Sequence, residues 1–214
     1  MNCRIVIPVR PFGEGKSRLA GVLGPEERGA LAERMFRHVL GVAKEVGDVS
    51  IVTREGRLLA EFADMAIRET GRETGRETGG QNAALEEAAA TLGGEAPILA
   101  LAADLPWLRR PELAAMLELS KTAEVVAAPD AAGTGTNALL LARPHLIPYA
   151  FGPGSLARHA DLARAAGLRL ALCRQPGLAN DIDTPADLGA LKAAEEEAAA
   201  EAAAGHGAAT GARP

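Results

Sequence analysis

RIVIPVRPFGEGKSRL, residues 4–19, contains the first predicted strand and the first indication of function. Residues 5–9 (IVIPV) form an apolar run without a polar break, which is typical of a strand buried on both faces of a parallel sheet. The loop that follows combines two glycines with three cations: Gly13, Gly15, Arg10, Lys16 and Arg18. Small residues let a backbone approach an anion, and Arg and Lys neutralise it. The stretch therefore indicates a first strand that leads into a site for polyphosphate.

Two known phosphate-binding motifs are incomplete in this loop. Gly15-Lys16-Ser17 matches the end of a P-loop, but that motif requires glycine at the position of Arg10. The dinucleotide fingerprint requires a third glycine at the position of Arg18. On this stretch alone, a solvated basic loop and a phosphate site are both open.

Composition restricts the class of protein. At 214 residues and 22.0 kDa, with 48% hydrophobic and 24% charged residues, the chain fits one large domain, which we place at residues 1–192. A net charge of −5 and 3% aromatic residues argue against a nucleic-acid partner. Neither a membrane-spanning run nor a signal-peptide pattern is present. Cys3 and Cys173 are far apart in sequence, as expected for reduced thiols in a cytoplasmic protein.

Apolar periodicity predicts alternating strands and helices. We expect strands over 5–9, 49–53, 65–68, 97–104, 124–129, 138–142 and 168–173, and helices over 25–46, 57–64, 81–92, 111–119, 155–167 and from 185 onward. The alternation predicts a three-layer α/β sandwich around a mainly parallel sheet. The strand-turn-strand pattern over 124–142 has no helix between its strands, which predicts one antiparallel member.

Two low-complexity segments fall outside this pattern. The unit RETG occurs three times within residues 68–79, and we interpret 68–80 as an expanded mobile surface loop. Residues 193–214 are rich in alanine and glutamate, so we expect the last helix to fray from Gly205 and the chain end to be disordered.

Three aspartates point to a divalent cation. Asp104 follows the apolar strand PILALAA, at the strand end where open α/β sheets bind ligands, although capping of the next turn is an equal alternative. Asp181 and Asp183 project to the same side of an extended chain. Thr184, Pro185 and Asp187 match a helix capping pattern, which does not require the two upstream acids, whereas a divalent cation does.

A glycine-rich turn before the fifth predicted helix indicates an anion site. Gly152 and Gly154 precede Ser155, a good N-cap residue, so backbone N–H groups are free there. Arg158 follows closely, and His159 is expected on the helix surface. Two side-chain amides, Gln81 and Asn82, begin an earlier helix. Cations, acids and an anion site together indicate a metal-assisted reaction of a nucleoside triphosphate with a second anion.

These features occur in the same order in one known family. The matching segments are Pro8-Val-Arg10 with Lys16-Ser-Arg18-Leu19, Asp104-Leu-Pro106, Gly133-Thr-Gly-Thr136, Phe151-Gly-Pro-Gly-Ser155 with Arg158-His159, and Asp181-Ile-Asp183-Thr-Pro185. As a set they resemble the phospholactate/phosphoenolpyruvate (or 3-phospho-D-glycerate) guanylyltransferases of deazaflavin coenzyme F-420 biosynthesis, which are related to molybdenum-cofactor-type nucleotidyltransferases. The resemblance covers roughly residues 4–191, and the RETG repeats depart from it.

The resemblance implies a Rossmann-like, GT-A-like nucleotidyltransferase fold and a reaction. GTP and a phosphorylated three-carbon carboxylic acid would give a guanylylated acid and pyrophosphate, and a downstream transferase would use that labile product. Arg10, Lys16 and Arg18 would be catalytic, holding the triphosphate and the departing pyrophosphate. Asp104, Asp181 and Asp183 would hold Mg²⁺.

The remaining assignments concern the two substrates. Arg10, Gly13 and Lys16 would bind the nucleotide, with Gln81 and Asn82 as a hypothesis for base reading. The acceptor would be bound by Thr136, Gly152, Gly154, Ser155 and Arg158, with His159 as a further source of charge.

Two other functions stay open. A nucleotidyltransferase acting on a sugar or polyol phosphate would share the first loop and the acids but differ in the acceptor pocket. A GTP-binding regulatory module would bind nucleotide without releasing pyrophosphate.

Overall fold

The computed structural model describes residues 3–70 and 80–208, the last six of them by backbone only. Residues 71–79, which contain most of the RETG repeats, and the end of the chain after Ala208 lie outside the described residues, so most of the predicted mobile loop (68–80) and of the predicted disordered end is not described. None of the helices in the described part of the chain is both long and apolar enough to span a bilayer.

The apolar run at residues 5–9 forms β1 (Arg4–Val9), in the interior of a seven-stranded sheet. Because successive side chains in a strand point to opposite faces, Ile5, Ile7 and Val9 join the core on one face and Val6 joins the core on the other. All four are buried. A strand buried on both faces explains why the sequence shows no polar alternation here.

The sheet has the order β3-β2-β1-β4-β6-β5-β7 and is mainly parallel. Its remaining strands are β2 (Asp48–Thr53), β3 (Ala66–Arg68), β4 (Ile98–Leu101), β5 (Val125–Pro129), β6 (Thr136–Leu141) and β7 (Leu170–Leu172). Strand β6 runs antiparallel to both β4 and β5, while β1 is parallel to β2 and β4. The expected antiparallel member is therefore confirmed.

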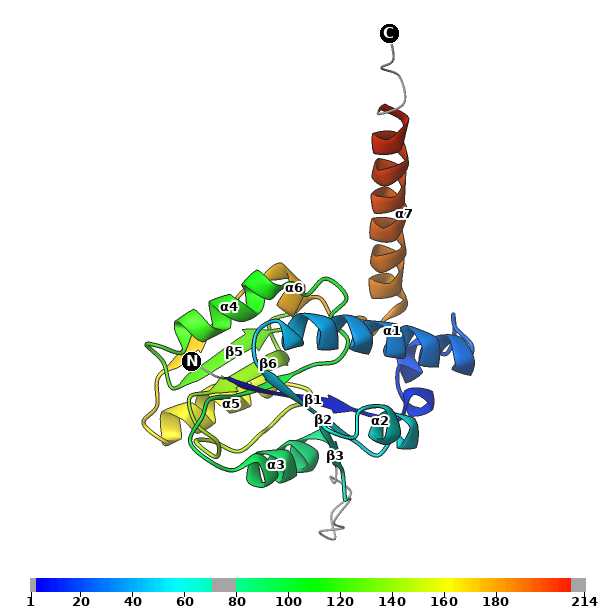
Figure 1. Ribbon diagram of the computed structural model, residues 1–214. Coiled ribbons are helices and arrows are strands. Elements are labelled where there is room, and N and C mark those ends of the chain that lie inside the picture. The colour runs from blue at the N-terminus through cyan, green and yellow to red at the C-terminus, as the bar shows by residue number, and fades with distance from the viewer. Residues whose placement is uncertain (1–2, 71–79, 209–214) are drawn as a thin grey trace.

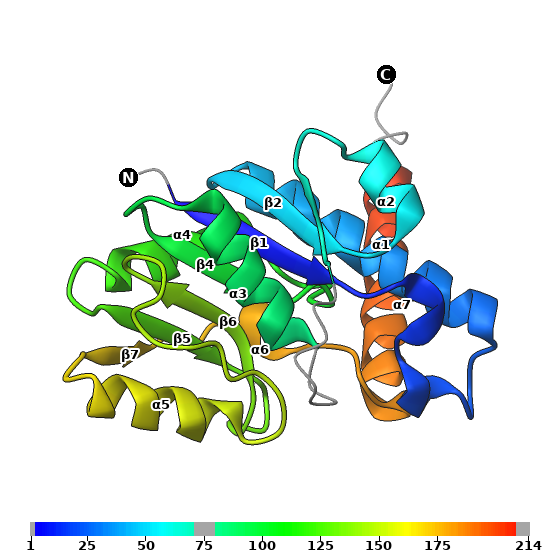
Figure 2. The same cartoon turned by 90° about the horizontal axis from the view of Figure 1, so that it is seen from below.

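Helices cover both faces of the sheet, which confirms the three-layer architecture (Figures 1 and 2). Helices α1 (Pro25–Lys44) and α4 (Arg110–Leu119) pack on one face, where Phe36 and Met116 belong to the core. Helices α3 (Gln81–Leu92) and α5 (Ser155–Ala165) pack on the other. The shorter helices are α2 (Gly56–Glu61) and α6 (Pro176–Ala179).

Two local predictions need correction. The expected strand over 97–104 ends at Leu101, because the chain leaves the ladder after Ala102 donates a hydrogen bond to Asn137 O at 2.8 Å. Asp104 therefore lies in a loop past the strand. Helix α6 was not predicted, because its four residues leave no room for an apolar stripe.

The C-terminal helix α7 (Pro185–Ala208) contacts the body of the molecule through its first half, where Glu195 forms an ion pair with Arg34 of α1 at 2.6 Å. Leu188 and Leu191 pack with Ile182, Leu19 and Met35 in a separate apolar cluster that joins the basic loop, α1 and the start of α7. Further along, the helix projects from the body of the molecule (Figure 1). It continues past Gly205, where fraying was expected, to Ala208.

Candidate active site

A cavity of about 570 Å³ opens at the edge of the sheet where β1, β2, β3 and β4 end and β6 begins. Its volume is in the range typical of small-molecule sites. Segments that are distant in sequence meet there, including the basic loop after β1, the loop after β4 and residues 181–183. The strand ends predicted to converge therefore do so.

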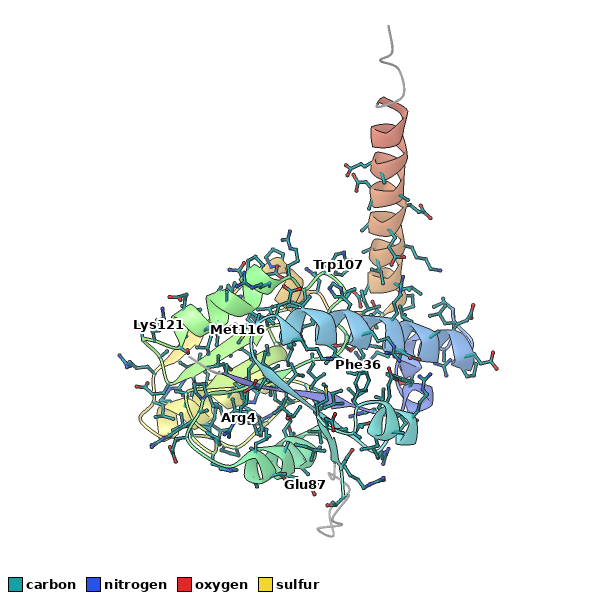
Figure 3. All side chains as sticks on the ribbon, in the orientation of Figure 1. Arg4, Phe36, Glu87, Trp107, Met116 and Lys121 are labelled. Carbon is teal, nitrogen blue, oxygen red and sulfur yellow. The ribbon has the colours of Figure 1, made fainter. Side chains whose placement is uncertain are left out.

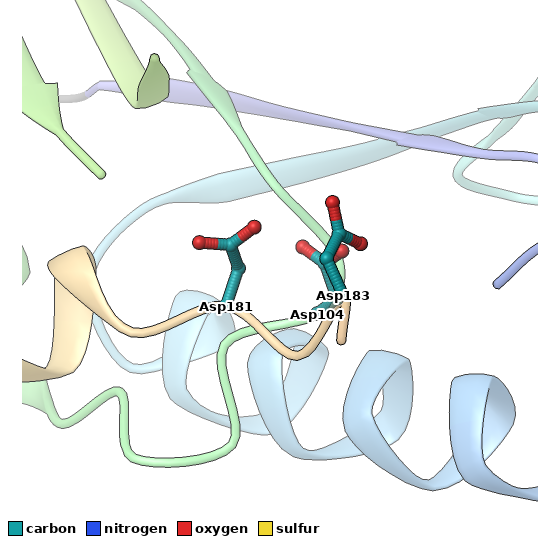
Figure 4. A group of neighbouring side chains, drawn as sticks. All are labelled: Asp104, Asp181 and Asp183. Atoms are coloured by element: carbon teal, nitrogen blue, oxygen red, sulfur yellow. The ribbon is translucent and has the colours of Figure 1, made fainter. Parts of the chain in front are cut away.

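Asp104, Asp181 and Asp183 lie together beside this cavity (Figure 4). One carboxylate oxygen from each lies within 4.8 Å of the others. Burial raises the pKa of Asp181, and the negative charge of Asp104 raises it further. The oxygens of three neighbouring carboxylates are hard ligands, and such a donor set fits a divalent cation. This cluster can hold such a cation.

Lys16 lies against two of these acids. Its Nζ is hydrogen-bonded to Asp104 and lies 3.0 Å from Asp183 Oδ1, and its side chain is 8% exposed. Burial alone would lower the pKa of the ammonium, but the two carboxylates outweigh burial and raise it. The backbone at Lys16 is left-handed (φ 59°), a conformation that few non-glycine residues adopt and that tends to occur at functional sites.

The other residues of the basic loop are more open. Arg10 and Arg18 line the cavity, and the Arg18 guanidinium lies 3.6 Å from Asp183 Oδ2 with a side chain 70% exposed. Of the two glycines in the loop, Gly15 lines the cavity, whereas Gly13 lies in a short 3-10 turn (Phe12–Glu14) outside it. The side assigned to nucleotide phosphates is therefore strongly cationic.

Asn137 is a site residue that the sequence analysis did not identify. Its Nδ2 lies 3.1 Å from Asp181 Oδ1 and 3.1–3.2 Å from the carbonyl oxygens of Leu178 and Ala179. The Asn137 amide has two N–H groups, and these three oxygens lie within hydrogen-bond distance of it, so it links α6 to the Asp181 carboxylate. In the sequence, its position at the end of the turn DAAGTGTN was the only feature that could have marked it as a site residue.

A buried carboxylate holds the other side of α6. Glu112 is 4% exposed and accepts hydrogen bonds from the backbone N–H groups of Arg109 and Gly177, both at 2.8 Å. A Cβ at Gly177 would lie 2.4 Å from Trp107 O, so only glycine fits at this position. Together with Asn137, these contacts fix the segment that leads into Asp181 and Asp183.

The capping pattern at the start of α7 also orients an acid. Asp187 Oδ2 accepts hydrogen bonds from Asp183 N at 3.0 Å, Thr184 N at 2.7 Å and Thr184 Oγ1 at 2.8 Å. The predicted cap is confirmed. The same interaction fixes the backbone from which the Asp183 side chain reaches Lys16.

The far end of the cavity contains the glycine turn at the start of α5. Gly152 and Gly154 have positive φ values of 115° and 71°, so they provide conformations that other residues rarely adopt. The N-cap is Gly154 and not Ser155, which is the first helical residue. Ser155 is buried, lines the cavity and its Oγ has no partner among the described residues. This hydroxyl is available to a polar group in the cavity.

His159 and Thr136 form a buried pair behind this turn. His159 is fully buried, not on the helix surface as expected, and its Nδ1 lies 3.1 Å from Thr136 Oγ1. Its Nε2 accepts a hydrogen bond from Ala150 N at 3.1 Å. Burial, with a contribution from Arg158, lowers the pKa of His159 to about 4. At neutral pH the imidazole is therefore uncharged, so it adds no charge to the site.

Two residues assigned to substrates instead hold the glycine turn in this structure. Arg158 donates to the carbonyl oxygens of Ala150 and Pro153 and does not line the cavity. The Asn82 amide exchanges two hydrogen bonds with the backbone of Phe151, at 3.2 and 2.8 Å. Gln81, by contrast, lines the cavity.

Chemically, the cavity combines three parts along the edge of the sheet. A cationic loop follows β1, the acid cluster is formed by the loop after β4 and the segment between α6 and α7, and hydroxyl and backbone donors lie at the start of α5. Cations and helix N-termini bind phosphates, and carboxylates bind the cation that accompanies a nucleoside triphosphate. The arrangement suits transfer of a phosphorus-containing group between two anions.

Comparisons with known proteins agree with this chemistry. A family model described as "Guanylyl transferase CofC like" matches residues 3–201. The chain is 39% identical to a phosphoenolpyruvate guanylyltransferase of Rubrobacter xylanophilus, over 90% of this chain and 95% of the relative. It is 38% identical to one from Sphaerobacter thermophilus, over 88% and 91%.

Solved structures show the same fold. A protein from Desulfovibrio desulfuricans, provisionally named a nucleotide-diphospho-sugar transferase, aligns with a TM-score of 0.69 at 19% identity, over 89% of this chain and 87% of that one. The chain is thus an α/β nucleotidyltransferase, and it belongs to the CofC-like guanylyl transferase family.

Proposed function

We propose that the protein transfers GMP from GTP to the phosphate of phosphoenolpyruvate and releases pyrophosphate. The observation that carries the proposal is the contact of Lys16 with Asp104 and Asp183 inside one cavity, opposite the free Ser155 hydroxyl. The names of the relatives from Rubrobacter and Sphaerobacter support the identity of the acceptor.

Each end of the cavity has groups for one substrate. Arg10, Lys16 and Arg18 would bind the triphosphate of GTP and stabilise the charge on the departing pyrophosphate. Ser155 Oγ and the backbone N–H groups near Gly152 and Gly154 would bind the carboxylate and phosphate of the acceptor. Thr136 would act with them, oriented by the neutral His159.

Asp104, Asp181 and Asp183 would hold Mg²⁺, which is the divalent cation that accompanies nucleoside triphosphates in most transferases of this kind. When bound, it would neutralise charge on the reacting phosphates. The protein's own task is to keep the three carboxylates converged, which Asn137, Glu112 and Asp187 do through the contacts described above.

The chemical step does not need a general base. The second pKa of a phosphate monoester is ~6, so its oxygens are ionised at neutral pH. One such oxygen attacks the α-phosphorus of GTP, and the bond from that phosphorus to the bridging oxygen of the β-phosphate breaks. Pyrophosphate leaves with both electrons of that bond. The absence of a base from the proposed site residues is consistent with this step.

In the product, one anhydride bond joins the phosphate of the acid to the phosphate of GMP, and such an activated acid is suited to transfer. We infer that a downstream transferase consumes it, in the biosynthesis of the deazaflavin coenzyme F-420. The same site chemistry would accept 2-phospho-L-lactate or 3-phospho-D-glycerate, which differ from phosphoenolpyruvate by a few atoms.

Pyrophosphate release tests the proposal. The purified protein is incubated with GTP, Mg²⁺ and each of the three acids, with the downstream transferase present to remove product. We expect phosphoenolpyruvate to give the fastest release and omission of the acid to give none. Faster release with a sugar phosphate would contradict the acceptor assignment, and GTP binding without pyrophosphate release would indicate the regulatory module.

A further inference from the structure

The order of strands arranges the cavity along one line. From one edge of the sheet inward, β3, β2, β1 and β4 are followed at the same end by Glu69, Arg54, Arg10 and Asp104. At about 4.8 Å between strands, the end of β3 lies roughly 14 Å from the end of β4. The donors assigned to the acceptor, Ser155 and the glycine turn, lie at the β6 end of this line, so the base of a nucleotide whose α-phosphate lies near Asp104 has room toward β2 and β3.

Glu69 is the acid at that end of the cavity. It lines the cavity, as do the acid cluster and Asp130, but Asp130 is bonded to Thr134 N in its own turn. Within residues 3–70 and 80–208, the Glu69 carboxylate has no hydrogen-bond partner. A carboxylate without a partner in the nucleotide half of the cavity is available to a ligand.

The backbone around Glu69 is held on both sides. Its N–H donates to Thr53 O of β2 at 3.0 Å. The next residue, Thr70, donates from N and Oγ1 to the Glu87 carboxylate of α3, at 3.2 and 2.7 Å. Figure 3 labels Glu87 on α3 below the end of the sheet that contains β3. These hydrogen bonds hold the backbone at Glu69 in place.

Gln81 offers the complementary group. It is the first residue of α3, lines the same cavity, and its amide has no partner within the described chain. Its neighbour Asn82 is already bound to the backbone of Phe151, so of these two amides Gln81 is the one free to read a base. Val52 and Ala84 also line the cavity and provide apolar surface.

These groups match the hydrogen-bonding edge of guanine. Guanine presents two adjacent donors, N1–H and the 2-amino group, beside the acceptor at its 6-oxo group. An ionised carboxylate only accepts hydrogen bonds, and it can accept two in parallel, while a glutamine N–H can donate to a carbonyl oxygen. Adenine has an acceptor at N1 and no amino group at position 2, so it would place a lone pair against the carboxylate.

We propose that Glu69, with Gln81, selects guanine at this site. The inference rests on the proposed function, since it requires a nucleotide phosphate near Asp104. Glu69 accepts hydrogen bonds from N1–H and the 2-amino group, and Gln81 donates to the 6-oxo group.

A change of base preference tests the assignment. Xanthine has a carbonyl oxygen where guanine has its 2-amino group. In Glu69→Gln, the amide oxygen can still accept from N1–H while the amide nitrogen donates to that carbonyl. We expect the GTP affinity to fall at least about 100-fold, as when a polar site loses its matching group, and the affinity for xanthosine triphosphate to rise. The KM for phosphoenolpyruvate should stay unchanged.

Calorimetric titration of each nucleotide without acceptor makes the test independent of turnover. Glu118→Gln on α4 removes the same charge from an exposed position, and it should bind both nucleotides as the wild type does. Gln81→Ala should weaken GTP binding with no gain for xanthosine triphosphate. Equal losses for both nucleotides in Glu69→Gln, or no change, would overturn the assignment. If the wild type binds GTP selectively but releases no pyrophosphate, the proposed reaction fails while the base assignment stands.

Discussion

Replacing Asp183 with alanine is expected to lower turnover by more than about 100-fold, since the loss of groups that only support a metal ligand already costs 10- to 100-fold. The Asp183 carboxylate takes part in the acid cluster and also pairs with Lys16 and Arg18. Its removal would take away one ligand of the divalent cation and one anchor of the triphosphate loop. The measurement is kcat with saturating GTP, Mg²⁺ and phosphoenolpyruvate.

The fold should survive this change. The Asp183 side chain is 45% exposed, and the cap of α7 uses its backbone N–H, which alanine retains. The thermal midpoint should therefore stay close to that of the wild type. Asp161→Ala removes an aspartate from an exposed ion pair on α5 and should leave kcat unchanged. Full activity of Asp183→Ala at low Mg²⁺ would show that the cation is held elsewhere.

Replacing Lys16 with methionine is expected to change two quantities in opposite directions. Turnover should fall at least about 100-fold, because a donor to the developing charge of pyrophosphate is lost. The affinity of the nucleotide-free protein for a divalent cation should rise. In this structure the Lys16 ammonium contacts two of the three acids, so it competes with a cation for the same carboxylates.

The expected gain in cation affinity is at least about tenfold, because a unit charge near 4 Å contributes several kcal/mol even at an effective dielectric constant of 20. Calorimetric titration with Mg²⁺ or Mn²⁺ measures it. Arg18→Met is the matched control, since Arg18 is exposed and, of the three acids, contacts Asp183 alone, and it should give a much smaller gain. Unchanged cation affinity in Lys16→Met would mean that the lysine does not compete. A gain would imply that a bound triphosphate, by attracting Lys16, favours binding of the cation.

The sequence was most informative where local pattern and sheet geometry agree. The unbroken run at residues 5–9 identified an interior strand because burial on both faces removes polar alternation. The short turn over 130–135 identified the antiparallel strand because it leaves no room for a crossover helix. Asp104, Asp181 and Asp183 were predicted to converge because acids that follow parallel strands lie at one edge of a sheet, and the structure brings them together.

The parts that could not be predicted depend on contacts between distant segments. Glu112 and Asn137 hold α6 from 65 and about 40 residues away in sequence, respectively, and nothing local marks them as partners. Burial of His159 depends on Thr136 and the backbone at Ala150, so its charge state could not be inferred from its place on a helix. For the same reason Arg158, which is basic and close to a glycine turn, was assigned to the substrate although its donors bind that turn.

We propose that the three converging carboxylates, with Lys16 beside them, form a site for a divalent cation. Electron paramagnetic resonance of Mn²⁺ titrated into nucleotide-free protein measures this site, with the wild type compared with Asp104→Asn, Asp181→Asn and Asp183→Asn. We expect one saturable site in the wild type and an affinity at least about tenfold weaker in each variant. Equal Mn²⁺ binding by the wild type and all three variants would show that these carboxylates do not hold the cation.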